Sequence, residues 1–126
     1  MEVWRITREL TAVVYAATDK RRSAKGFGWR DPVRRATGSI THNVAEGFDA
    51  GSNAGFIRSL NHAKRSCTEV QSELQVALDQ RHIVKSEFAT LYEKADLLQA
   101  KIGALIKCLQ EFESKKRTRS TVNRDP

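Results

Sequence analysis

The strongest constraint on the fold comes from a stripe of apolar residues in the last third of the chain. Spaced alternately three and four residues apart, its members are Phe88, Leu91, Ala95, Leu98, Ile102, Leu105, Leu109 and Phe112. This spacing places all of them on one face of a helix, and it is typical of the contacts between helices in bundles. The stripe predicts a helix over residues 85–113 whose apolar face other helices must cover.

Apolar residues recur at similar intervals in three earlier segments and predict helices over about 2–18, 32–47 and 54–80. Pro32, after a capping aspartate, suits the first helical position of the second of these helices. Gly38 lies inside the same helix, where glycine costs about 1 kcal/mol relative to alanine, so another backbone is expected to approach it closely. Four helices with short connections predict an all-α fold, an antiparallel up-and-down four-helix bundle.

The net positive charge is concentrated in two short segments. The chain has 22 Lys and Arg residues against 15 Asp and Glu, a formal net charge of +7. Residues 20–35 hold seven cations against one aspartate, a net of +6, and residues 114–126 hold five against one, a net of +4. No core-forming pattern follows Phe112. We therefore predict that residues 1–113 form the bundle and that residues 114–126 form a basic, mobile tail.

Several classes of protein are disfavoured by what the sequence lacks. Two cysteines cannot build the disulfide framework of a small secreted domain, and no secretory signal or membrane-spanning apolar run is evident. A cytoplasmic protein without membrane contact is therefore expected. Glycine-rich phosphate loops, nucleophile elbows and paired cysteine motifs are also missing, so neither an enzyme activity nor a cofactor is expected.

Isolated reactive side chains are the remaining candidates for chemistry. His42 and Glu46 are four residues apart on a predicted helix, a spacing that suits a metal or an acid–base pair. A metal site needs a third ligand that the sequence does not identify, so no metal site is predicted and a hydrolase stays an alternative. Cys67 falls on an apolar stripe and is expected to be buried and inert, whereas Cys108 flanks the last stripe.

Residues 20–35 are the segment best suited to carry a function. Cations pair with phosphates, and the interleaved Phe27 and Trp29 rings either stack on unpaired bases or cap the end of the bundle. The leading hypothesis is a non-enzymatic protein that binds RNA or DNA largely through phosphate contacts. The alternative is a protein-interaction scaffold whose cations aid solubility or dock an acidic or nucleic-acid-associated protein. The predicted nucleic-acid-binding residues are Lys20, Arg21, Arg22, Lys25, Arg30, Arg34 and Arg35.

The junction of the second and third predicted helices resembles a known family. The runs 31–36 and 39–48, the second with an Asn-x-Ala-Glu-Gly element, are similar to the bacterial 23S rRNA intervening-sequence protein family. Further matching positions are Ser52, Phe56, Leu60, Ala63, Ser66 and Glu69. The resemblance covers about residues 2–112 and implies a four-helix bundle that assembles as a ring-like homopentamer, with no established enzymatic activity. Related accessory proteins of diversity-generating retroelements use basic surfaces to bind nucleic acid and a reverse transcriptase.

Two positions depart from the family's pattern. The family usually has proline where this chain has Thr41, and glycine where this chain has Arg65. The first change is expected to straighten the second helix, and the second replaces a close-packing glycine with a bulky cation. The resemblance also gives Asn43 and Glu46 a structural role, because polar side chains in a small, apolar helix are expected to cap or bridge neighbouring helices through buried hydrogen bonds.

Overall fold

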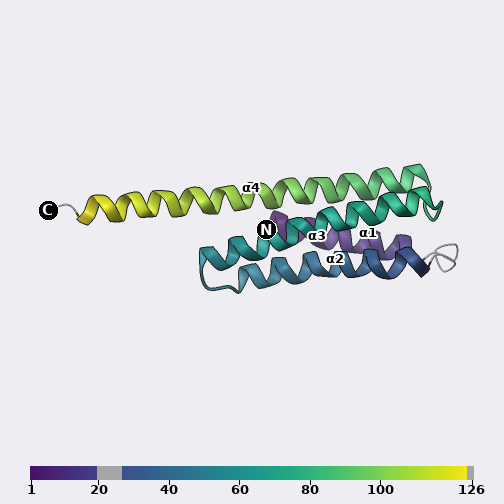
Figure 1. Ribbon diagram of the computed structural model, residues 1–126, viewed down its shortest axis with the longest axis horizontal. Coiled ribbons are helices and arrows are strands. Elements are labelled where there is room, and N and C mark those ends of the chain that lie inside the picture. The colour runs from purple at the N-terminus through teal and green to yellow at the C-terminus, as the bar shows by residue number, and fades with distance from the viewer. Residues whose placement is uncertain (20–26, 125–126) are drawn as a thin grey trace.

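The computed structural model describes residues 1–19 and 27–124 of the chain, and these residues form four helices and no strand. The helices are α1 (Glu2–Thr18), α2 (Phe27–Phe48), α3 (Asn53–Asp79) and α4 (Lys85–Arg124). Successive helices run in opposite directions, and each packs against two neighbours: α1 and α3 both contact α2 and α4 (Figure 1). The predicted all-α, up-and-down four-helix bundle is therefore confirmed. None of the helices in the described ranges has an apolar stretch that could cross a membrane.

The core lies where the apolar stripes of the four helices meet. The largest fully buried side chains are Trp29, Ile6, Leu10, Ile40, Leu60, Leu74, Leu98, Ile102, Val14, Val33, Val44 and Val70. Cys67 belongs to this core, as predicted, and burial raises the pKa of its thiol to about 12 because the thiolate would lose its hydration there. Cys108 is exposed on α4.

The stripe on α4 is buried in its middle and emerges at its end. Leu91, Ala95, Leu98 and Ile102 are buried, whereas the side chain of Phe112 is 58% exposed. The reason is the position of the neighbouring helix: Asn53, the first residue of α3, donates a hydrogen bond to Glu113 at 2.8 Å. The bundle therefore ends beside residue 113 of α4, and no helix among the described residues covers the ring of Phe112.

The second helix begins earlier than its predicted start at residue 32. It starts at Phe27, and Pro32 lies inside it. Trp29 explains the difference, because it precedes Val33 by four residues and so extends the apolar stripe by one turn. The indole is 1% exposed, and its burial stabilises a turn that the charged sequence around it does not indicate.

The fourth helix continues well past its predicted end. It reaches Arg124, so residues 114–124 of the predicted basic, mobile tail are helical. This segment contains neither glycine nor proline, so nothing in its sequence breaks the helix. At about 1.5 Å per residue it adds roughly 16 Å of helix, which projects beyond the other three helices (Figure 1). We call residues 114–124 the α4 extension.

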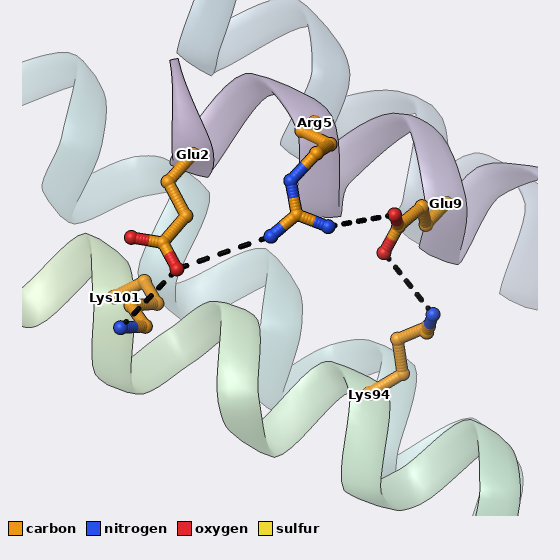
Figure 2. Close-up of polar contacts among 5 residues, drawn as sticks. All are labelled: Glu2, Arg5, Glu9, Lys94 and Lys101. Atoms are coloured by element: carbon orange, nitrogen blue, oxygen red, sulfur yellow. Dashed lines mark hydrogen bonds and ion pairs between the residues drawn. The ribbon is translucent and has the colours of Figure 1, made fainter.

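Ion pairs join α1 to α4 along one side of the bundle (Figure 2). Lys94 Nζ lies 3.2 Å from a carboxylate oxygen of Glu9, and Lys101 Nζ lies 3.3 Å from one of Glu2. Arg5 lies between the two carboxylates, 2.8 Å from Glu9 and 3.9 Å from Glu2. These contacts also confirm that α1 and α4 are antiparallel, because the earlier residue of α1 meets the later residue of α4.

Acid should remove the contribution of Glu9 to stability. Hydrogen bonds from Lys94 and then Arg5 hold the pKa of this carboxyl below its ordinary value of 4.5. A lowered folded-state pKa means that the stabilisation is complete above 4.5 and is lost as the pH falls through the lower value. In urea unfolding the wild type should be more stable than Glu9→Gln at neutral pH, and the difference should shrink progressively as the pH falls below 4.5. A difference that persisted unchanged in acid would contradict the ion-pair role.

Candidate nucleic-acid interface

The structure describes three of the seven cations in the predicted nucleic-acid-binding cluster. Lys20, Arg21, Arg22 and Lys25 lie outside the described residues. The other three, Arg30, Arg34 and Arg35, lie near the start of α2. This is the end of the bundle where α1 and α3 end and α4 begins.

Arg34 is engaged within the chain. Its Nε donates a hydrogen bond to Thr18 Oγ1 at 2.7 Å, and its Nη2 donates one to Asp19 Oδ1 at 2.6 Å. The guanidinium also lies over the ring of Tyr15, with Cζ 4.3 Å from the ring centroid. Its side chain is only 19% exposed. Arg34 thus fastens the end of α1 to α2, and the carboxylate of Asp19 offsets its charge.

Arg35 is exposed but lies close to acidic residues of α3. It lines a hollow of about 400 Å³ between α2 and α3 that Glu69 and Glu73 also line. A dense run of cations is stabilised either by a polyanion or by nearby carboxylates, and this end of the bundle supplies carboxylates. The described part of the predicted cluster is therefore less basic than the charge of residues 20–35 indicates.

The two aromatic residues of the basic segment were predicted either to stack on bases or to cap the bundle. Trp29 is buried at the end of the core, so the capping interpretation is correct for this ring. Its Nε1 has no hydrogen-bond partner in the described part of the chain. The side chain of Phe27 lies outside the described residues.

The predicted structural role holds in part for Asn43. Its amide nitrogen donates to the backbone oxygen of Ser39 at 2.8 Å, within α2, and lies 3.3 Å from Ser39 Oγ. Ser39 Oγ in turn lies 2.8 Å from Ser66 Oγ of α3. Among the described residues, Asn43 therefore reaches α3 through Ser39, and the two serine hydroxyls form a hydrogen bond between α2 and α3.

The predicted buried role is wrong for Glu46. Its side chain is 61% exposed and pairs with His42 of the same helix, with 3.7 Å between Nε2 and the carboxylate. The described residues contain no group of three or more His, Cys, Asp or Glu side chains placed to hold a metal ion. The chain thus places the pair on the outer side of α2, without the third ligand that a metal site requires.

Close packing of the backbone occurs at a different glycine from the predicted one. Gly38 is exposed, and a Cβ added there would meet nothing within 4 Å, so the predicted close approach is wrong within this chain. Gly47 is buried, and a Cβ there would lie 2.9 Å from Cδ1 of Phe56. The ring of Phe56 packs against that of Phe48, with centroids 4.9 Å apart and 60° between the ring planes. Gly47 is therefore the position where α2 has no room for a side chain.

The two departures from the family's pattern have simple structural consequences. Arg65 is exposed, and its Nη2 lies 2.6 Å from Nδ1 of His62, so the bulky cation lies outside the contact with α2. Thr41 continues α2 without a break and lies 3.4 Å from the Thr11 hydroxyl of α1. Both substitutions are thus accommodated by the same four-helix arrangement.

Further cations, which were not predicted as binding residues, lie on the first part of α3. Arg58, Lys64 and Arg65 are exposed there, alongside Lys107 of α4. The net charge of the sequence around them is close to zero, because the acidic residues in the second part of α3 offset these cations. A separate count for each half of that helix would have detected the change of sign.

Four antiparallel helices around one apolar core, with cations gathered on exposed helix faces, define a basic four-helix-bundle protein. The model of the 23S rRNA-intervening sequence protein family matches residues 1–104, and the chain belongs to this family. It is also similar to the crystal structure of a protein of unknown function from the S23 ribosomal protein family of Bacteroides thetaiotaomicron. The two are 22% identical, with a TM-score of 0.77 over 83% of this chain and 95% of the other. No curated protein matches this chain.

Proposed function

We propose that this protein is a non-enzymatic, self-associating helical bundle of the cytoplasm that binds RNA or DNA mainly through phosphate contacts. The observation that carries the proposal is the concentration of the net charge in two segments, 20–35 and 114–126, on a bundle that is otherwise slightly acidic. The second segment gains support from the α4 extension, on which Lys115 and Lys116 are exposed. A family named for 23S rRNA intervening sequences also agrees with an RNA ligand.

Nucleic-acid binding of this kind should depend steeply on salt and little on sequence. Fluorescence anisotropy with a labelled RNA hairpin, single-stranded RNA and single-stranded DNA measures the affinity over about 50 to 200 mM NaCl. Replacing Arg21, Arg22, Arg30 and Arg35 with alanine should lower the slope of log K against log salt by up to about 3, because each lost phosphate contact removes about 0.7–0.9. Arg34 is left in place because it fastens α1 to α2.

The matched control is Arg8→Ala, which removes an exposed cation of α1 outside the predicted cluster. It should leave both the affinity and the salt slope close to those of the wild type. Undetectable binding of the wild-type protein to all three probes at low salt would refute the proposal. Recovery of one acidic protein from a pull-down that resists nuclease and moderate salt would support the scaffold alternative instead.

Self-association has support from exposed apolar side chains. Met1 and Trp4 of the N-terminal region line a hollow of about 440 Å³ together with Ala45 and Phe48 of α2, and all four are exposed. Apolar surface of this kind is typical of contacts between subunits. Light scattering of a homopentamer would give five times the subunit mass of 14.2 kDa, and Trp4→Ser should shift the protein toward the monomer. A monomer at all concentrations would exclude the assembly.

A further inference from the structure

The helix α3 is divided by charge into two parts. The charged side chains of its first part, residues 53–68, are Arg58, Lys64 and Arg65. Those of its second part, residues 69–79, are Glu69, Glu73 and Asp79. All three cations are exposed to solvent. The part of α3 farthest from the predicted cluster is therefore the basic part, and the part beside that cluster is acidic.

Hydrogen bonds fix which part of α4 lies beside the basic part of α3. Asn53 donates to Glu113 at 2.8 Å, and Gln99 donates to Thr68 Oγ1 at 3.0 Å. Residues 53–68 of α3 thus run antiparallel to residues 99–113 of α4. The cations of these two stretches occupy the same section of the bundle.

Lys64 and Lys107 both lie near the boundary between α3 and α4. The ammonium of Lys64 would lie 3.7 Å from a Cβ added to Gly103, so this side chain reaches across from α3 to α4. Lys107 is exposed and lies one turn after Gly103 on α4, a spacing that keeps it on the same face. Lys64 and Lys107 therefore lie on one surface that crosses the boundary between the helices, and Arg58 and Arg65 lie on the adjacent exposed face of α3.

The cations of this surface differ from those between α1 and α4, which pair with carboxylates of α1. Lys94 and Lys101 are both in ion pairs with glutamates of α1 (Figure 2). In contrast, Arg58, Lys64 and Lys107 form no ion pair with any carboxylate of the described residues.

Glu69 and Glu111 lie one turn after Arg65 and Lys107, but neither forms an ion pair with them in the described part of the chain. The gathered cations therefore outnumber the nearby carboxylates, and the positive local potential favours a polyanionic ligand.

The α4 extension adds two exposed cations beyond the end of the bundle, on different sides of the helix. Lys115 and Lys116 are exposed on it, about two turns after Lys107. Arg58 and Arg65 are seven residues apart on α3, or about 10 Å along the helix. Cations spread over such lengths on exposed helix faces suit the successive phosphates of a nucleic-acid backbone better than one small anion.

We infer that Arg58, Lys64, Arg65 and Lys107 form a second phosphate-binding surface for nucleic acid, which Lys115 and Lys116 extend. We call these six residues the α3–α4 basic surface. The inference rests on the proposed function and adds a site on the side of the bundle away from Arg30 and Arg35 at the start of α2. A bound strand therefore contacts the side of α3 and α4 as well as, or instead of, the start of α2.

Gly103 provides a test that leaves every cation in place. Gly103→Glu puts a carboxylate beside the ammonium of Lys64, and the helix accepts it because the space next to Gly103 is open to ordinary contact. The matched control is Gly103→Gln, which has the same shape without the charge. We expect Gly103→Glu to weaken binding of the labelled RNA hairpin by about tenfold at low salt and Gly103→Gln to leave it unchanged.

The triple variant Arg58→Ala, Lys64→Ala and Lys107→Ala gives an independent measurement. Its salt slope should be lower than that of the wild type by about 2 to 3. Wild-type affinity and slope in this variant and in Gly103→Glu would overturn the inference. If the variant at Arg21, Arg22, Arg30 and Arg35 then loses binding, the proposed function stands without this surface. Failure of the wild-type protein to bind any probe refutes the proposed function itself.

Discussion

Replacing Trp29 with alanine is expected to lower the free energy of unfolding by about 3–5 kcal/mol. The indole is 1% exposed at the end of the core, and its removal leaves a cavity where the first turn of α2 meets the bundle. Urea unfolding followed by circular dichroism measures the change. A loss below about 1 kcal/mol would show that the ring contributes little to the core.

Trp29→Phe is the matched control for the polar part of the indole. Phenylalanine keeps an aromatic ring, and the Nε1 that it lacks has no hydrogen-bond partner among the described residues. Its cost should therefore be only that of the lost volume, about 1 kcal/mol. Because the buried ring cannot stack on a base, Trp29→Phe should also bind nucleic acid as the wild type does. A large loss of affinity in this stable variant would contradict the capping role.

Opposite results are expected from alanine at two glycines of α2. Gly47→Ala should lower the free energy of unfolding by about 1–3 kcal/mol, because the new Cβ would lie 2.9 Å from the ring of Phe56. Gly38→Ala should raise it by up to about 1 kcal/mol, because the site is open and alanine favours the helix. The midpoints of thermal unfolding of the two variants should lie on opposite sides of the wild type.

The two glycine variants also serve as controls for each other, because both make the same chemical change in the same helix. Destabilisation by both would show that a second backbone approaches Gly38 after all, as it would if that position lay in a contact between subunits. Light scattering on Gly38→Ala separates these cases, since a disturbed contact lowers the mass and a disturbed bundle does not.

The fold was predictable because apolar spacing is a local property that the helix period translates directly into a buried face. The ends of helices were less predictable. The extra turn of α2 depends on a single buried indole among charged residues, and the length of α4 depends on the absence of helix breakers, which no apolar pattern indicates. At the end of α4 a weak local preference operates where the stripe has already ended, whereas at the start of α2 one isolated core residue extends the stripe.

The candidate site was harder to predict, because charged residues interact with their neighbours in space and the sequence shows only their neighbours along the chain. Arg34 was predicted to bind nucleic acid, but its guanidinium donates hydrogen bonds to Thr18 and Asp19 within the chain. Lys64 and Lys107 are 43 positions apart in the chain and lie on one surface only because α3 and α4 are antiparallel. Which residues of two neighbouring helices lie side by side depends on how far each helix is shifted along the other in the bundle.

The different surroundings of the two cysteines give the protein one natural attachment point for a spectroscopic label. The thiol of Cys67 is enclosed in the core, and its pKa of about 12 keeps it protonated at neutral pH. Cys108 is exposed immediately after Lys107. A maleimide dye should therefore react at this position alone, without any engineered residue. Its emission would then report directly on whether a nucleic acid approaches α4.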